Sequence, residues 1–431
     1  MISIRLRLST ITTVVTSILL ISLGLVMGFR VGRTGSLPFG LKLATVDAWL
    51  AKTPLTSLSR LTGTPEPPKT LSHEPVNFDI FWEVWGLLEQ DFLETDKLDA
   101  AKMVDGAIDG LTSSLEDPYT TYLPPNDNQR SSEDLAGSFY GVGIELGYIE
   151  NTLAAVAPLK DSPAAKAGVL AGDLILHVKD DSQKFDSDTA GWSLNEAVDH
   201  IRGKKGTIVV LTVLRKEANN NQPFEIPIQR DEIIVKSVTL EFVTQGGKRV
   251  AHLTLSKFGE RTQEEWNQAV TEILNDRTNI RGIVLDLRNN PGGFFDTSIE
   301  IASDFVKKDI IVSQQGKQKS EDYLSSGKYR LGGIPLVVLV NRGSASAAEI
   351  VAGALRDDLQ TKMVGEKTFG KGTVQDRREL SNGGGLHITI GRWLLPKGGW
   401  IHKEGIPVDV EIKDNPDTKE DEVLLKGIEL L

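Results

Sequence analysis

The sequence of 431 residues contains no cysteine. Disulfide bonds, thiol nucleophiles and cysteine-ligated metal sites are therefore excluded. Basic residues are in deficit, with 48 Lys and Arg against 59 Asp and Glu, and the formal net charge is −11. The chain as a whole thus lacks the basic footprint of a nucleic-acid-binding protein. Its 40% hydrophobic and 25% charged residues are typical of globular domains and exclude disorder throughout.

Charged residues are also missing from Leu8 to Phe29, a run of 22 residues rich in Leu, Ile and Val. A run of this length can cross a bilayer, which requires about 20 apolar residues. A secretory signal has a shorter core and small residues before its cleavage site, whereas an Arg-Val-Gly-Arg segment follows Phe29. We therefore favour an uncleaved anchor over a cleaved signal for residues 1–33. Arginines flank the run on both sides, so the positive-inside rule does not orient it.

The next segments predict a linker and then helices. Residues 34–76 contain a proline cluster with Ser, Thr and Gly, which favours extended chain without regular structure. Apolar residues then follow helical spacing in an aromatic stripe from Phe78 to Phe92, and a second helix is expected over Ala100 to Leu115. We interpret the aromatic stripe as part of a helical core. The polar run from Pro124 to Glu133 predicts a joint.

The remainder predicts two further regions. Residues 138–230 form a β-rich module, because short apolar runs alternate with turn residues there. Beyond Ile233, strands and helices alternate, which predicts an α/β layer. The continuous apolar run Leu336–Val340 is typical of a strand buried on both faces, and helical spacing follows at Ala347–Leu355.

A loop of small residues between this strand and this helix contains Ser344 and Ser346. The first turn of a helix presents unpaired N–H groups and a partial positive charge, which can stabilise an oxyanion. A serine there can act as a nucleophile, but serine is also a preferred N-cap residue, and local sequence alone favours the cap. Alanine on both sides of Ser346 leaves its hydroxyl open and favours the nucleophile.

A serine nucleophile needs a general base. Histidine is the first candidate, and His252, His387 and His402 lie in the α/β region, but neither serine lies in a Gly-x-Ser-x-Gly elbow. Lys371, which is set between two glycines, is the second candidate. Burial would have to lower its pKa by roughly three units from ~10.4, and Gln375 could orient its amine. A solvated lysine in a glycine turn is the alternative.

A second glycine pair, Gly292 and Gly293, follows a short buried strand. Tandem glycines let backbone N–H groups approach a ligand closely, so this loop and the N–H of Ala347 could together hold an oxyanion. The alternative is a tight strand exit in which Asp286 and Arg288 form a structural ion pair.

Two other kinds of site are disfavoured. The stretch around Lys371 partly matches a phosphate-binding loop, but Gly372 occupies its Ser/Thr position and no helical spacing follows. No spaced cluster of His, Asp and Glu in the sequence predicts a metal site.

Together these segments resemble the carboxyl-terminal processing peptidases, serine proteases with a Ser/Lys dyad, over roughly residues 77–412. The Gly-Ser-Ala-Ser-Ala-Ala-Glu-Ile, Gly-Lys-Gly and Asp-Leu-Arg-Asn-Asn-Pro-Gly-Gly segments carry the resemblance. It implies that Ser346 is the nucleophile, that Lys371, 25 residues later, is the base, and that Gln375 positions the lysine. It also implies an oxyanion hole from the backbone of Gly292, Gly293 and Ala347. Neither a cofactor nor a metal is implied.

The resemblance further implies a multidomain α+β fold. Its expected parts are a helical N-terminal domain over 77–135, a PDZ domain over 136–231 and an α/β protease core of the crotonase and Clp-protease type over 232–431.

A PDZ domain binds the carboxyl end of a polypeptide, which adds a strand to the sheet edge while a nest of N–H groups holds the carboxylate. The residues that resemble this carboxylate-binding loop are Tyr140, Gly141, Val142, Gly143 and Ile144. Arg202 lies where related peptidases couple tail binding to activity.

We therefore expect an extracytoplasmic serine endopeptidase, in a periplasm or thylakoid lumen, that is membrane-anchored or exported. Its expected partners are proteins or peptides with accessible carboxyl termini, and the membrane through the N-terminal segment. No nucleic-acid partner is expected, and the oligomeric state is open. The alternative is an inactive, membrane-tethered PDZ scaffold that binds carboxyl termini. The intact set of Ser346, Lys371 and Gln375 argues against it.

Overall fold

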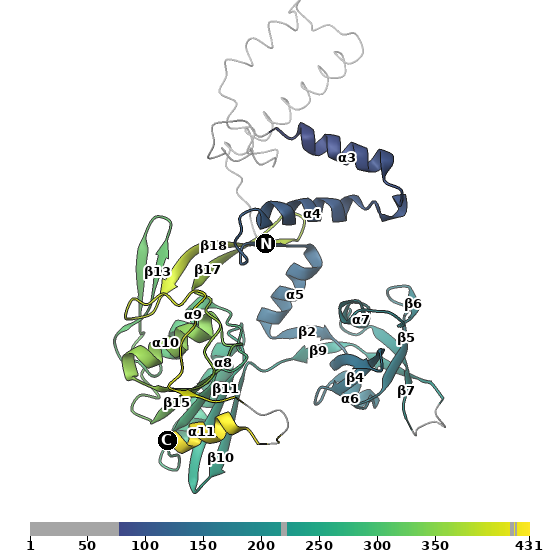
Figure 1. Cartoon of the computed structure of the whole chain (residues 1–431). Coiled ribbons are helices and arrows are strands. Elements are labelled where there is room, and N and C mark those ends of the chain that lie inside the picture. Colours follow the sequence, from purple (N-terminus) through teal and green to yellow (C-terminus); the bar gives the residue numbers. More distant parts are fainter. Residues whose placement is uncertain (1–76, 217–221, 414–417, 419) are drawn as a thin grey trace, which may run out of the picture. The chain divides into compact units, whose positions relative to one another are not determined.

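The computed structural model describes residues 77–216, 222–413, 418 and 420–431 (Figure 1). The predicted anchor at 1–33 and linker at 34–76 lie outside the described residues. Within the described ranges, no helix has the length and apolar character needed to cross a bilayer. The chain divides into two compact units, Met1–Leu98 and Asp99–Leu431.

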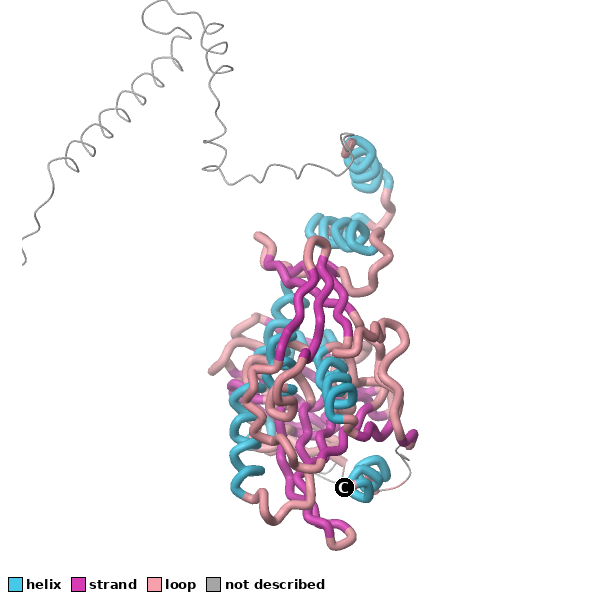
Figure 2. Tube along the Cα trace, turned by 90° about the vertical axis from the view of Figure 1, so that its left-hand side faces the viewer, coloured by secondary structure: helices cyan, strands magenta, loops and turns pink. Residues whose placement is uncertain are grey.

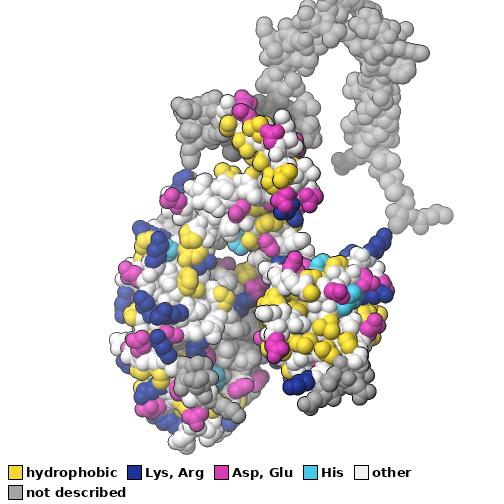
Figure 3. Space-filling view, turned by 45° about the vertical axis from the view of Figure 1, so that its right-hand side comes forward, with side chains coloured by type: hydrophobic (Ala, Val, Ile, Leu, Met, Phe, Trp, Pro, Cys, Tyr) yellow, Lys and Arg dark blue, Asp and Glu magenta, His cyan; other side chains and the backbone are white. Residues whose placement is uncertain are grey.

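The described part of the first unit is helical. It contains α3 (Asp79–Asp91) and the short 3-10 helix η2 (Thr95–Lys97). The aromatic rings contact one another along α3, with the Phe81 ring centroid 5.1 Å from that of Trp82. No residue of α3 is buried, and its apolar side chains lie at the surface (Figure 3). The aromatic stripe is thus not a buried core here, because helical spacing defines an apolar face without specifying what covers it.

The second unit begins with two helices that flank a short strand. These are α4 (Ala100–Ser113), β1 (Thr121–Leu123) and α5 (Pro125–Ala136). The Asp99 carboxylate caps α4 by accepting from the N–H groups of Ala101 and Lys102, and the expected helix is confirmed. The predicted joint at Pro124–Glu133 is wrong, because α5 occupies it. Proline is favourable in the first turn of a helix, and a mostly polar helix shows no apolar periodicity.

The β-rich module contains a sheet of six strands. Five follow the order β3-β4-β5-β7-β8, and β6 pairs with β5. The strands are β3 (Ile144–Ile149), β4 (Thr152–Pro158), β5 (Leu174–Asp180), β6 (Phe185–Asp188), β7 (Ile208–Leu214) and β8 (Phe224–Gln229). The two helices are α6 (Pro163–Ala167) and α7 (Leu194–Ile201). Alternate residues of β7, such as Val209 and Leu211, enter its apolar core. A separate ribbon pairs β2 (Ser138–Gly141) with β9 (Asp231–Ile234).

A second six-stranded sheet forms the centre of the α/β region, in the order β10-β11-β12-β15-β16-β19. Its strands are β10 (Val238–Gln245), β11 (Lys248–Leu255), β12 (Ile283–Asp286), β15 (Leu336–Val340), β16 (Lys362–Gly365) and β19 (Val410–Glu411). From β11 onward neighbouring strands are parallel. Parallel strands need crossover connections, which are usually helical, and a helix lies between β11 and β12 and between β15 and β16 in the chain. Helices and strands pack side by side in this part of the molecule (Figure 2).

Helices cover both faces of this sheet. They are α8 (Thr262–Asn275), α9 (Phe295–Ala302), α10 (Ala347–Leu359) and α11 (Glu422–Leu430). The first three pack with Leu285 and Val338 in one apolar cluster. The neighbouring strand residues Val284 and Val337 point the other way and pack with α11. Burial on both faces explains why β15 is a continuous apolar run, and it confirms the mixed α/β expectation.

A separate sheet of five strands completes the α/β region. It contains β1, β13 (Ile310–Gly316), β14 (Ser320–Leu324), β17 (Thr373–Glu379) and β18 (Gly385–Leu394). β18 pairs with β1, β13 and β17. The residues predicted for the active site lie in the loops after β12 and β15, at the first residue of α10, in the segment before β17 and in β17 itself.

Candidate active site

Ser346 occupies a strained turn between β15 and α10. Its backbone has φ 54° and ψ −117°, a conformation that side-chain-bearing residues rarely adopt and that is often associated with functional sites. Neighbouring contacts hold the turn, since Ala345 N donates to Asn290 O at 2.9 Å and Ser346 N donates to Glu349 Oε2 at 2.9 Å. A strained serine between a strand and a helix is the geometry of a nucleophile elbow, here formed without the Gly-x-Ser-x-Gly sequence.

Ser344 has a structural role in the same loop. Its side chain is fully buried. Its hydroxyl donates to Leu287 O at 2.8 Å and accepts from Asn341 N at 2.9 Å. Of the two candidate serines, Ser344 therefore fastens the loop, and Ser346 lines the cavity described next.

One cavity of about 360 Å³ collects residues from widely separated segments. All six residues predicted for the catalytic site and the oxyanion hole line it: Gly292, Gly293, Ser346, Ala347, Lys371 and Gln375. Apolar side chains complete much of the wall, among them Phe295, Ile350 and Trp393. The fold thus brings together what the sequence separates by 83 residues, from 292 to 375.

Lys371 lies partly buried in this cavity. Burial lowers the pKa of its amine, and the negative charges of Asp117 and Glu349 oppose this effect without reversing it. A lowered pKa is the direction that a lysine base needs. The Nζ atom lies 5.0 Å from the centroid of the Tyr119 ring.

The side chain of Gln375 is held by threonines. Its Nε2 donates to Thr373 Oγ1 at 2.9 Å and to Thr389 Oγ1 at 3.2 Å. Thr389 is its direct cross-strand partner on β18. These bonds occupy the N–H₂ group of the Gln375 amide and leave its carbonyl oxygen to contact Lys371, which lines the same cavity.

The glycine loop approaches Ser346 closely. Gly292 and Gly293 have φ 99° and 137°, which favour glycine. A Cβ on Gly292 would lie 2.8 Å from Ser346 Cβ, and one on Gly293 would lie 2.1 Å from Phe258 O, so a side chain is excluded at both positions.

The two glycine N–H groups differ in their partners. Gly292 N donates to Asn290 Oδ1 at 2.9 Å, so it is not offered to a ligand in this arrangement. Among the contacts of the described residues, the N–H groups of Gly293 and Ala347 have no acceptor. Both residues line the cavity, so these two N–H groups are open to a ligand there.

Glu349 joins the loops of Ser346 and Lys371, and the sequence analysis missed it. Its fully buried carboxylate accepts from Ser346 N, Lys371 N, Gly370 N and Thr368 Oγ1, at 2.9, 2.9, 2.7 and 2.6 Å. Burial raises the pKa of Glu349 although these bonds oppose the shift. The Ser-x-x-Glu spacing of a capping box was the available signal.

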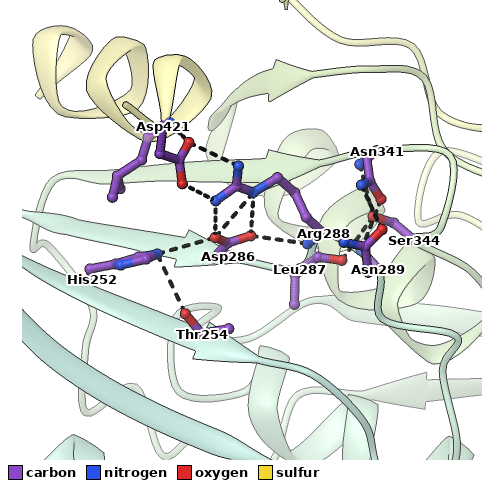
Figure 4. A network of polar contacts seen from close by, with 10 residues as sticks. His252, Thr254, Asp286, Leu287, Arg288, Asn289, Asn341, Ser344 and Asp421 are labelled. Atoms are coloured by element: carbon purple, nitrogen blue, oxygen red, sulfur yellow. Dashed lines mark hydrogen bonds and ion pairs between the residues drawn. The ribbon is translucent and has the colours of Figure 1, made fainter. Parts of the chain in front are cut away.

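Asp286 and Arg288 form a buried ion-pair network (Figure 4). Arg288 Nη2 lies 2.6 Å from Asp286 Oδ2 and 2.7 Å from Asp421 Oδ2, and His252 Nε2 lies 3.1 Å from Asp286 Oδ2. Burial alone would raise the pKa of Asp286, but the bonds to His252 and Arg288 hold it below its usual range. The structural ion pair is thus the better interpretation, and it fixes the end of β12 ahead of the glycine loop.

His387, also a base candidate, lines the same cavity from β18. Its Nε2 is enclosed, and no partner for it exists among the described residues. Burial lowers the pKa of its imidazole, and the charges of Arg377 and Lys371 add to this effect. Arg377 is its direct cross-strand neighbour on β17. Across the described ranges, no group of three or more His, Asp or Glu could hold a metal.

The predicted carboxylate-binding loop connects β2 to β3. Gly143 has φ 72°, and a Cβ there would lie 2.5 Å from Ser162 Cβ. The carbonyl oxygens of Val142 and Gly143 accept from Ala164 N and Leu159 N, each at 2.9 Å. These bonds fix one side of the loop Tyr140, Gly141, Val142, Gly143 and Ile144.

Arg202 follows α7 and lies beside this loop. Its guanidinium lies 4.2 Å from the centroid of the Phe139 ring. Its Nη1 also lies 3.1 Å from Glu133 Oε2 on α5, so Arg202 joins the β-rich module to α5.

Comparisons with known proteins identify relatives of the chain. Residues 249–412 match peptidase family S41, and residues 58–126 match the N-terminal domain of the activating protease CtpB. The carboxy-terminal processing protease CtpB of Bacillus subtilis is 34% identical over 369 residues, which cover 80% of this chain and 74% of the relative. CtpA of the same organism is 36% identical over 344 residues, which cover 80% and 70%.

A solved structure of an S41 protease from Bacteroides fragilis is 14% identical, with a TM-score of 0.52 over 85% of this chain and 98% of that one. At this identity the likeness concerns the fold alone. The two Bacillus relatives carry the assignment. The chain therefore belongs to peptidase family S41, among the carboxy-terminal processing proteases, and is a serine-type peptidase.

Proposed function

We propose that the chain is an endopeptidase that processes or degrades proteins from their carboxyl ends with a Ser346/Lys371 dyad. The observation that carries this proposal is the single cavity shared by Ser346, Lys371 and the glycine loop. The strained turn presents Ser346 at the start of α10, and burial lowers the pKa of Lys371. These features suit acyl transfer without a metal or cofactor.

In the first step, neutral Lys371 accepts the proton of the Ser346 hydroxyl while Oγ bonds to the scissile carbonyl carbon. The N–H groups of Gly293 and Ala347 stabilise the oxyanion that develops. As the C–N bond breaks, the lysine ammonium returns its proton to the departing amine. A water molecule then hydrolyses the acyl-enzyme, with the lysine again as the base. The carbonyl oxygen of Gln375 would orient the lysine amine.

We also propose that the β-rich module is a PDZ domain that captures the substrate's carboxyl end. The glycine-containing loop Tyr140–Ile144 supports this proposal, because its fixed turn can direct N–H groups at a carboxylate. Arg202, which lies beside that loop and pairs with Glu133, would couple tail binding to the protease core.

The proposed location is extracytoplasmic, with residues 1–33 as an anchor or an export signal. The support is the uncharged run of 22 residues from Leu8 to Phe29. N-terminal sequencing of the mature protein after cell fractionation tests this proposal, since a start at Met1 in the membrane fraction supports an anchor.

Replacing Ser346 by alanine tests the proposed chemistry. Full-length Ser346→Ala should fold but should not cleave casein or a disordered protein with an accessible tail, because no other hydroxyl replaces the nucleophile. Ser325→Ala, whose hydroxyl lies outside the cavity and donates to Val306 O, is the matched control and should keep activity. Cleavage by Ser346→Ala at the wild-type rate would exclude Ser346 as the nucleophile.

A further inference from the structure

Tyr119 contacts the predicted catalytic base from a segment that has no role in the mechanism above. The Nζ atom of Lys371 lies 5.0 Å from the centroid of the Tyr119 ring. This is within the roughly 6 Å at which an ammonium is attracted to an aromatic face. Tyr119 lies in the turn between α4 and β1, more than 250 residues before the lysine.

Hydrogen bonds hold this turn in place. The Asp117 carboxylate accepts from Tyr119 N at 3.1 Å and from Thr120 Oγ1 at 2.7 Å. Thr120 Oγ1 in turn accepts from Thr389 N of β18 at 3.1 Å. The turn is therefore bonded to β18. This strand pairs with β17, which begins two residues after Lys371.

Aromatic contacts fix the ring from its other side. Tyr119 meets His402 edge to face with 5.9 Å between ring centroids. His402 stacks on Trp400 at 5.0 Å with an interplanar angle of 12°. Trp400 Nε1 donates to Gly372 O at 2.9 Å. The series of contacts that begins at Tyr119 therefore ends at the residue after Lys371. Burial lowers the pKa of His402, so this imidazole does not add a competing cation at neutral pH.

An aromatic face attracts an ammonium far more strongly than a neutral amine, because the attraction comes from the ring quadrupole. Lys371 must be neutral before it accepts the Ser346 proton and becomes an ammonium as the proton arrives. The contact with the ring is therefore stronger in the transition state than in the ground state, which is the condition for an interaction to accelerate a reaction.

We propose that Tyr119 is a positioning residue for the Lys371 base. The face of the Tyr119 ring holds the Lys371 ammonium that forms when Ser346 loses its proton. This inference rests on the proposed dyad. It assigns to the Asp-Pro-Tyr-Thr turn a part in catalysis that neither the cavity nor the hydrogen bonds of Lys371 reveal.

Other charged groups near Lys371 also influence the pKa of its amine. Asp117 lies two residues before Tyr119 in the same turn, and Glu349 lies on α10. The negative charges of both raise the pKa of Lys371. Burial, with contributions from Glu349 and Asp117, raises the pKa of Tyr119, so the ring stays neutral over the working range. The remaining charged or titratable groups that line the cavity are Asp134, Lys257, Arg377 and His387.

Tyr119→Leu in the full-length protein tests the inference, because leucine keeps an apolar cover and removes the aromatic face. We expect kcat/KM at its pH plateau to fall by about 3- to 30-fold, the range of a cation–π contact. Loss of the ring destabilises the ammonium, so the acid limb of the kcat/KM profile should move to lower pH. Tyr119→Phe, which keeps the face, should restore both the rate and the limb towards wild type.

The chain offers a matched control in Tyr329, whose ring centroid lies 5.8 Å from Lys307 Nζ outside the cavity. Tyr329→Leu should leave the rate and the acid limb unchanged. If the kcat/KM profile of Tyr119→Leu keeps the wild-type acid limb, the inference is overturned, whatever the loss of rate. A purely structural role of Tyr119 would lower the fraction of active protein without shifting the pKa of Lys371.

A second measurement works without turnover. In a Ser346→Ala background, the pH dependence of Lys371 acetylation, read by mass spectrometry, reports its pKa directly. Adding Tyr119→Leu should lower that pKa, and an unchanged value contradicts the inference. Full activity of Ser346→Ala itself would instead refute the proposed dyad, so the two failures are distinguishable.

Discussion

At the scale of single residues, Glu349 shows how one buried carboxylate can organise the two loops that carry Ser346 and Lys371. It accepts hydrogen bonds from the backbone N–H groups of both Ser346 and Lys371. The Ser-x-x-Glu spacing was visible in the sequence, but it indicates only a helix cap. The bonds to Gly370 and Thr368 depend on tertiary packing, so the joining role could not be predicted.

Glu349→Gln should therefore weaken both stability and activity. The amide has one accepting oxygen and places N–H₂ against the remaining donors, so at least one buried donor loses its partner. We expect the free energy of unfolding to fall by about 1–3 kcal/mol, together with kcat/KM, as measured by urea denaturation and cleavage assays. Glu321→Gln, which breaks an exposed ion pair with Lys319, is the control. Equal effects of the two substitutions would contradict this role of Glu349.

At the scale of elements, strands and helices with a clear apolar pattern, either periodic or continuous, were predicted well, and a mostly polar helix was not. The α/β alternation and the apolar run of β15 follow from burial on both faces. Helix α5 was missed because its residues are mostly polar. The loop after β12 was identified from its glycines. The hydrogen bond from Gly292 N to Asn290 Oδ1 depends on the side-chain conformation of Asn290, which residue spacing does not predict.

The network at the end of β12 gives a prediction for stability. In Asp286→Asn the buried Arg288 keeps Asp421 but loses its other charged partner, which should cost about 1–3 kcal/mol of unfolding free energy at pH 7. The folded-state pKa of Asp286 lies below its usual value. Its stabilising contribution is therefore present above the unfolded-state pKa, and it disappears as pH falls through the folded-state pKa.

Chemical denaturation of the wild type and Asp286→Asn between pH 7 and pH 2 measures this effect. The difference in unfolding free energy should shrink on the acid side. Asp181→Asn, at an exposed position beside Lys179, should change little at any pH. A difference between wild type and Asp286→Asn that stays constant with pH would contradict the charged role of Asp286.

At the scale of the whole molecule, three separated motifs predicted one site, and the fold brings them to one cavity. Helical spacing in α3 did not predict its environment, since no residue of that helix is buried. The turn that carries Tyr119 shows the same limit, because its contact with Lys371 arises from the pairing of β1 with β18. Such long-range contacts have no local signature in a single sequence.

The central claim is that Lys371 activates Ser346. Labelling the full-length protein with a fluorophosphonate, followed by peptide mass spectrometry, tests it most directly, because the probe reacts with an activated serine independently of any protein substrate. We predict that the label appears on Ser346 in the wild type and is lost in Lys371→Ala, while circular dichroism shows that this variant is folded. Labelling of Ser346 in Lys371→Ala at the wild-type rate would contradict the account.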